Sequence, residues 1–351
     1  MNYNKIQIHK TEFDDNYILI YDNQTLSVGY IVKIIVEYLQ DGIIDSMIIK
    51  EKLFFKNSLE ININEIDIIV EKISVFINNK NKHSFTKLFK IFNPSIINLN
   101  RLNFLFTSKI FYVLFLITLL INITFTYKIT KHQVNNDSHI IWLILTLLIL
   151  FLHELGHAIS ANKFNIKCDE IGLGLYLIFP VLYINLGESW KLEKNKRIII
   201  NLSGIYFQLI IGAIIGFLAV FHITTLFSHL FYTNLTVLLL NFNPLIKFDG
   251  YWVLADIMNI KDLSKKADET LKKIKHLEFS KLKNWLIIYT LFRTLFFLYI
   301  IYFLFNSIIK ILLKLYKFEE LSNYQYFLVI IIIAVLLKKI KNELKTRKSR
   351  I

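Results

Sequence analysis

Two histidines and a glutamate lie at the end of an otherwise apolar helix, in the stretch LLILFLHELGHAIS (residues 147–160). Ionisable side chains are costly in such a run, so they require a partner or a function. His153 and His157 are four residues apart, so both imidazoles share one helical face and could bind a single zinc ion. Glu154 could then act as general base on a zinc-bound water, whose pKa falls to about 7. The alternative is three polar side chains packed at a helix end or reaching towards water.

A metal site needs at least one more ligand, and Asp249 is the candidate. It ends the stretch NFNPLIKFD after a later apolar run, at a predicted membrane depth similar to that of the histidines. Two histidines, one aspartate and an open position for water are typical of catalytic zinc, because a structural site is closed by a fourth protein ligand. Pro244 interrupts its helix, which could shape a cleft or hold an extended peptide. The alternative for Asp249-Gly250 is an ordinary turn.

The composition indicates a membrane protein. Of the 351 residues, 54% are hydrophobic and 15% aromatic, and the mean hydropathy is +0.47. The formal net charge is +14. In a chain with several spans, an excess of lysine and arginine usually marks the cytosolic loops, so we expect membrane lipid as a partner and no nucleic acid. Cys168 is the single cysteine, which excludes a disulfide framework within the chain and favours a structural role for this residue.

The hydropathy pattern predicts a mainly α, polytopic helical membrane protein with about six spans. A further apolar segment, residues 170–190, contains three glycines and Pro180, so a hairpin or re-entrant segment is expected there. The lysines and arginines favour cytosolic amino and carboxyl termini in the cell membrane. The expected spans are residues 110–127, 140–159, 198–221, 226–246, 286–306 and the short 326–337.

Residues 1–80 differ from the rest and predict a small, winged-helix-like α+β cytosolic domain. IQIH and YILIY are typical of short strands, and LSVGYIVKIIVEYLQDG predicts a helix that stops at Asp41-Gly42. A second helix is expected after Asp45 and a third after Asn64, each with that residue as its cap. The other domains are a basic juxtamembrane linker at 81–109, a transmembrane domain with the candidate zinc site at 110–341 and a basic cytosolic tail at 342–351.

HExxH in one span and NPxxxxDG in a later one resemble the site-2 protease family of intramembrane zinc metalloproteases. The resemblance implies one Zn²⁺ per chain, bound by His153, His157 and Asp249, with Glu154 as catalytic base. The position of Asn243 matches a residue that in such proteases helps to hold the substrate backbone.

The resemblance extends over roughly residues 147–267 to a bacterial branch of peptide zinc metalloproteases found beside genes for ribosomally made peptides. It includes the stretches KRIIINLSGIYFQ and NPLIKFDGYWVLADIMNIKDLSKKA. One departure is Ile205 after Gly204, where the family often has proline. Residues 1–80 are similar in pattern to the PqqD-like winged helix that recognises leader peptides, although a generic adaptor is the alternative.

These patterns predict an intramembrane zinc metalloendopeptidase that cuts a small precursor or leader peptide at the cytosolic side of the membrane, with residues 1–80 binding the leader. The alternatives are regulated proteolysis of a membrane-bound signalling protein, or a non-catalytic exporter or immunity protein. Arg293 lies within a predicted span, where it could pair with a substrate carboxylate or with a buried acid.

Overall fold

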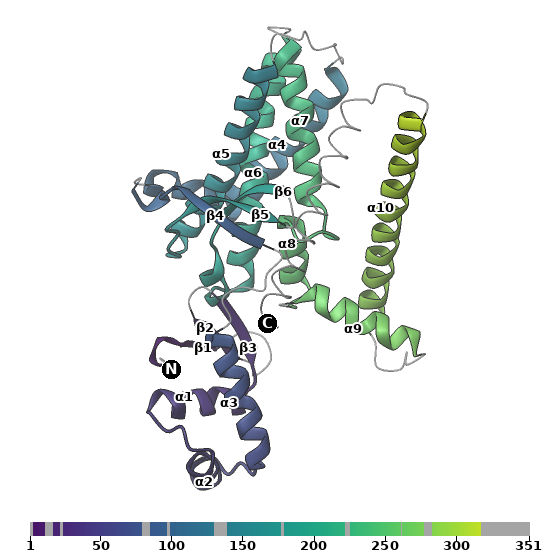
Figure 1. Ribbon diagram of the computed structural model, residues 1–351. Helices are drawn as coiled ribbons and strands as arrows, with labels where there is room; N and C mark the ends of the chain where they lie inside the picture. The colour runs from purple at the N-terminus through teal and green to yellow at the C-terminus, as the bar shows by residue number, and fades with distance from the viewer. Residues whose placement is uncertain are drawn as a thin grey trace. The chain divides into compact units, whose positions relative to one another are not determined.

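The fold is mainly helical (Figure 1), and the chain divides into two compact units. The first unit comprises residues 1–83, 87–174 and 182–261, and the second comprises 84–86, 175–181 and 262–351. The computed structural model describes residues 3–10, 17–21, 24–78, 85–96, 99–129, 139–176, 179–221, 225–260, 262–276 and 283–316.

The amino-terminal part of the first unit is a three-stranded antiparallel sheet with three helices. The elements are β1 (Gln7–Lys10), β2 (Tyr17–Tyr21), β3 (Gln24–Val28), α1 (Tyr30–Gln40), α2 (Ser46–Asn57) and α3 (Ile63–Asn78). The strand order is β1-β2-β3, and Leu19 of the central strand lies opposite Ile8 and Leu26. The apolar face of α3, including the fully buried Ile66, packs into the core beside Leu19, as its helical spacing predicts.

Two local predictions for this domain are corrected. The helix expected over residues 26–42 begins only at Tyr30, because residues 24–28 pair with β2 as a strand. The cap expected at Asn64 is also wrong: α3 begins one residue earlier, and the side-chain oxygen of Asn62 accepts the Asn64 amide at 3.4 Å. The Asp45 cap is confirmed, since its carboxylate accepts the Met47 amide at 2.8 Å.

The hydrophobic part of the chain is built from long helices. The elements of the first unit are α4 (Ser108–Lys128), α5 (His139–Lys163), α6 (Lys194–Val220), α7 (Thr225–Phe242) and α8 (Asp249–Ile257), and those of the second are α9 (Leu263–Lys275) and α10 (Asn284–Tyr316). Short 3₁₀ helices lie at Tyr3–Lys5, Pro94–Ile96, Leu99–Phe106 and Gly187–Lys191.

Four of the described helices are long and apolar enough to cross a membrane: Ser108–Lys128, Ile140–Lys163, Lys194–Val220 and Asn284–Lys314. They correspond to four of the six predicted spans. The span predicted over 226–246 coincides with α7, which ends at Phe242 and is not among these four. The span predicted at 326–337 and the basic tail at 342–351 lie outside the described residues.

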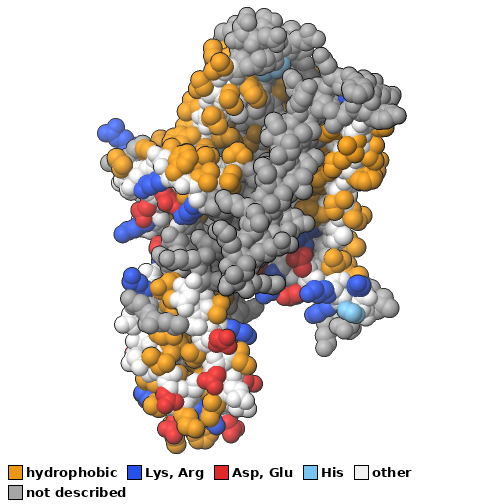
Figure 2. Space-filling view, in the orientation of Figure 1, with side chains coloured by type: hydrophobic (Ala, Val, Ile, Leu, Met, Phe, Trp, Pro, Cys, Tyr) orange, Lys and Arg blue, Asp and Glu red, His pale blue; other side chains and the backbone are white. Residues whose placement is uncertain are grey.

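Within the first unit, α6 packs against α4, α5, α7 and α8, and its side chains are largely buried. By contrast, α4 and α5 leave large apolar side chains exposed, such as Val113 and Ile144. Figure 2 shows hydrophobic side chains gathered over the described membrane helices. An apolar outer surface of this kind is suited to lipid.

A second sheet precedes α6 along the chain. Its strands are β4 (Phe85–Phe92), β5 (Ile171–Tyr176) and β6 (Phe179–Ile184), in the order β4-β5-β6. The β5-β6 pair occupies the segment predicted as a hairpin. Strand β4 lies in the segment expected to be a juxtamembrane linker and was not predicted. It closely approaches β5, because a Cβ at Gly172 would lie 2.8 Å from the Phe89 carbonyl oxygen.

Candidate metal centre

His153 and His157 lie one helical turn apart on the face of α5 that is buried within the first unit. Their side chains are 7% and 4% exposed, and their Nε2 atoms are 3.2 Å apart. The helical register predicted from the sequence therefore holds, because residues at i and i+4 share a face. Close packing of α5 against α6 helps to bury them: a Cβ at Gly156 would lie 2.7 Å from the Ser203 carbonyl oxygen.

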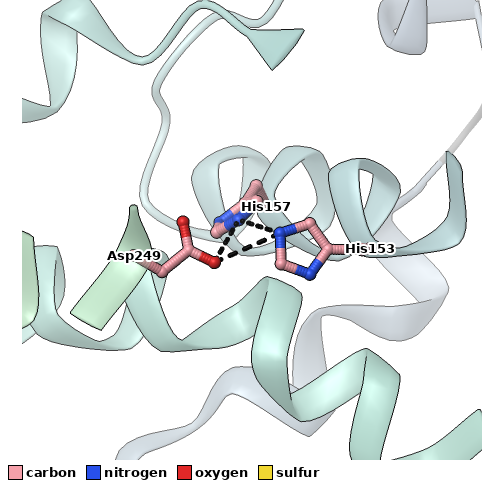
Figure 3. A group of neighbouring side chains, drawn as sticks. All are labelled: His153, His157 and Asp249. Atoms are coloured by element: carbon pink, nitrogen blue, oxygen red, sulfur yellow. Dashed lines mark hydrogen bonds and ion pairs between the residues drawn. The ribbon is translucent and has the colours of Figure 1, made fainter. Parts of the chain in front are cut away.

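Asp249 is the first residue of α8, and its carboxylate reaches both histidines (Figure 3). Its Oδ2 lies 3.1 Å from Nε2 of His153 and 3.4 Å from Nε2 of His157. A turn between α7 and α8 brings it there, in which the Asn243 side-chain oxygen accepts the Leu245 amide at 2.9 Å. Gly250 permits the close approach, since a Cβ there would lie 2.2 Å from the Phe242 carbonyl oxygen.

The three converging atoms form a set of acceptors that fits a cation. Each imidazole has its other nitrogen beside an acceptor: Nδ1 of His157 lies 2.7 Å from the Ile200 carbonyl oxygen, and Nδ1 of His153 lies 3.1 Å from Oε1 of Gln208. With the ring protons on Nδ1, both Nε2 lone pairs point towards Asp249. Oδ2 of Asp249 is buried and receives no hydrogen bond from any described residue. In that tautomer the three atoms are mutually close acceptors, and a bound cation would stabilise them.

The spacing of the ligand atoms suits zinc. Around tetrahedral zinc with bonds of ~2.0 Å, neighbouring ligand atoms are about 3.3 Å apart. The three pairs of atoms in the site are separated by 3.1, 3.2 and 3.4 Å. His153, His157 and Asp249 are also the group of described residues whose side chains could together hold a metal ion.

Gly204 of α6 faces this group and leaves it room. A Cβ at this position would lie 2.4 Å from Nε2 of His157 and 2.6 Å from Nε2 of His153. A side chain at residue 204 would therefore displace the atoms that converge on the site. Ile205, which departs from the family pattern, continues α6 and is completely buried in its core.

The other predicted site residues are not among the three side chains that converge. Glu154 follows His153 on α5 and is half-buried, and its carboxylate does not belong to the converging group. The Asn243 side chain supports the turn before α8, and Pro244 is the next residue of that turn. Arg293 belongs to the second unit, where it pairs at 2.6 Å with Asp268, whose side chain is 60% exposed, so this partner is not the buried acid considered from the sequence.

Sequence reasoning missed the residues that hold the ligands in place. Gln208 contacts His153 from α6, and Arg197 pairs with Asp256, a residue of the same helix as Asp249. A polar signal was present, because Gln208 interrupts the apolar run of α6. Its partner, His153, lies on another helix, so the contact depends on how α6 packs against α5. The spacing of residues along α6 alone does not predict that packing.

Comparison with known proteins shows what the segment that carries the two histidines is similar to. Residues 141–225 match Peptidase family M50, a stretch that includes both histidines, the β5-β6 pair and α6. The chain is also similar to the "Putative peptide zinc metalloprotease protein YydH" of Bacillus subtilis (strain 168), at 27% identity over 129 residues. That alignment covers 35% of this chain and 51% of the relative, so it spans about half of the relative's length.

No solved structure matched the chain. The two sequence matches confirm the predicted resemblance to the site-2 type of membrane metalloprotease, and zinc is the metal that this family implies. The resemblance of residues 1–80 to PqqD-like domains stays a prediction.

Proposed function

We propose that this chain is an intramembrane zinc metalloendopeptidase that hydrolyses a peptide bond of a small precursor or leader peptide. The observation that carries the proposal is the convergence of His153, His157 and Asp249. The two histidines and Glu154 lie on the segment, residues 141–225, that matches Peptidase family M50. When bound, zinc would supply a Lewis acid that polarises the scissile carbonyl and lowers the pKa of water.

The residues of the chain would share the remaining chemistry. Glu154 would take a proton from the attacking water and deliver it to the amine that leaves. Its carboxylate suits this role because it adjoins the ligands in sequence without joining them. The substrate would have to be extended, because the carbonyl groups of a helical peptide are engaged in hydrogen bonds. Asn243 and Pro244, at the turn before α8, would lie along this extended substrate.

Residues 1–80 are proposed to bind the leader of the substrate. Support comes from the small antiparallel sheet, in which β1 and β3 are the outer strands and could pair with an extended peptide. The relative that matches this chain is named as a peptide zinc metalloprotease, which agrees with a peptide substrate. We also propose a multi-pass location in the cell membrane with both termini in the cytosol, based on the distribution of lysine and arginine.

The decisive experiment separates metal binding from catalysis. Glu154→Gln protein, purified in detergent and loaded with zinc, should retain the metal and lose cleavage of a quenched-fluorescence peptide library by about 10²- to 10⁴-fold. Glu193→Gln serves as the matched control, because this glutamate lies at the start of α6 with a side chain that is 59% exposed. Unchanged cleavage by zinc-loaded Glu154→Gln would exclude the proposed mechanism.

A further inference from the structure

Gln208 is a completely buried amide in the apolar helix α6. Its Oε1 lies 3.1 Å from Nδ1 of His153 and also accepts a hydrogen bond from Nδ2 of Asn241 at 3.1 Å. A buried amide in a span is costly unless it is hydrogen-bonded. Both contacts are made by Oε1, whereas the buried Nε2 of Gln208 has no hydrogen-bond partner among the described residues. The two contacts therefore define what this amide is positioned to do.

The chemistry of a histidine ligand explains the first contact. A neutral imidazole that offers Nε2 to a metal carries its proton on Nδ1, and that proton needs an acceptor. For His157 the acceptor is the main-chain carbonyl of Ile200, which a substitution does not remove. For His153 the acceptor is the side chain of Gln208, so this half of the site depends on the identity of residue 208.

The second contact supports one orientation of the amide. A glutamine side chain could turn either its oxygen or its NH₂ group towards His153. In the structure, Nδ2 of Asn241, in the last turn of α7, donates to Oε1 of Gln208, which agrees with the oxygen of Gln208 facing His153. With its oxygen held between Asn241 and His153, Gln208 presents an acceptor to the ring.

We propose that Gln208 and Asn241 are positioning residues that hold His153 in the tautomer and orientation required of a metal ligand. The inference rests on the proposed function, because it takes His153 to be a ligand of zinc. It adds a consequence for the end of α7: Asn241 precedes the Asn243-Pro244 turn by two residues, so the same helix end supports both the metal ligand and the proposed substrate turn.

Zinc affinity tests this inference without an assay of cleavage. Full-length protein in detergent is titrated with zinc against a competing chelator. Gln208→Met, which keeps the length of the side chain and removes the acceptor, should weaken zinc binding by about 10- to 100-fold. Gln208→Glu keeps an acceptor oxygen and should restore most of that affinity.

Asn234→Leu is the matched control. Asn234 is a buried amide of α7 that donates to the main-chain oxygen of Gln208 at 3.0 Å, and the hydrogen bonds described for His153 do not involve it. Its zinc affinity should stay within about threefold of the wild type. Thermal unfolding of each protein, followed with zinc removed, reports whether the fold is retained.

The outcomes separate this inference from the proposed function. A folded Gln208→Met protein that binds zinc as tightly as wild type overturns the positioning role and leaves the metal centre intact. An equal loss of zinc affinity in Gln208→Met and Asn234→Leu also overturns it, because the effect would then reflect helix packing. Wild-type protein that binds no zinc would instead overturn the metal centre itself, and this inference with it.

Discussion

Arg197 and Asp256 form a buried ion pair between α6 and α8, with Nε of the arginine 2.6 Å from Oδ1 of the aspartate. Both side chains are 3% exposed. Asn201 donates to the second carboxylate oxygen at 2.8 Å. Asp256 lies two helical turns after Asp249, so the two aspartates share one face of α8. The pair therefore sets the position of the helix that carries the proposed third ligand.

Asp256→Asn should destabilise the protein and weaken its zinc binding. Removal of one partner leaves a buried arginine without its counter-charge, which costs about 3–5 kcal/mol. Thermal unfolding and zinc titration measure the two effects. The pair Lys196–Glu193 offers a control on the same helix, because it is largely exposed and Glu193→Gln should change neither quantity appreciably. Normal zinc affinity in Asp256→Asn would mean that other contacts hold α8 in place.

Gly204→Ala should abolish tight zinc binding. The added Cβ would lie 2.4 Å from Nε2 of His157, closer than van der Waals contact allows, so the ring or α6 must move. Zinc content after dialysis, measured by elemental analysis, reports the result. Gly29→Ala is the control, because a Cβ at Gly29 meets no atom within 4 Å. Full zinc content in Gly204→Ala would contradict the close approach of α6 to the ligands.

Removal of zinc should lower the thermal stability of the wild-type protein. A ligand that binds only the folded state stabilises it, by about 2.7 kcal/mol when its concentration is 100 times its Kd. A chelator should therefore lower the unfolding temperature, and added zinc should restore it. His153→Ala should be insensitive to both treatments. A His153→Ala protein that keeps its full zinc content would disprove the proposed ligand set.

Cys168 should react slowly with alkylating reagents while the protein is folded. Burial, helped by the nearby Asp169 and Glu188 carboxylates, raises the pKa of its thiol to about 12. The thiolate is the reactive form, so at pH 8 its alkylation should be roughly a thousandfold slower than in the unfolded chain. Iodoacetamide labelling followed by mass spectrometry gives a clear signal, because this is the single cysteine of the chain. Equal rates with and without denaturant would show that the thiol is accessible.

The features of the fold and of the site that depend on one helix could be predicted from the sequence. The spacing of His153 and His157 and the Asp45 cap follow from local geometry, and the structure confirms both arrangements. Asp249 was a weaker candidate, because its distance from the histidines depends on the packing of three helices. Two further features supported Asp249 as a metal ligand: the histidine motif elsewhere in the sequence and the similar predicted membrane depth of the two segments.

The parts that depend on distant pairing could not be predicted. Strand β4 has an irregular order of apolar and basic residues, and its partner β5 begins only at Ile171, far beyond the end of β4 at Phe92. Strand β3 was taken for the start of a helix, although its pairing with β2 decides its conformation. The roles of Gly204 and Gln208 likewise arise where α6 meets α5, so no pattern within α6 alone could assign them.

The interval of two helical turns between Asp249 and Asp256 keeps both side chains on the same face of α8. Each residue of a helix adds about 100° of rotation and 1.5 Å of rise. One extra residue within this interval would keep Asp256 at Arg197 and swing Asp249 about a quarter of the way around the helix, away from His153 and His157. Sequence change in this segment is thus restricted to substitution, whereas insertion and deletion would separate the anchor from the ligand.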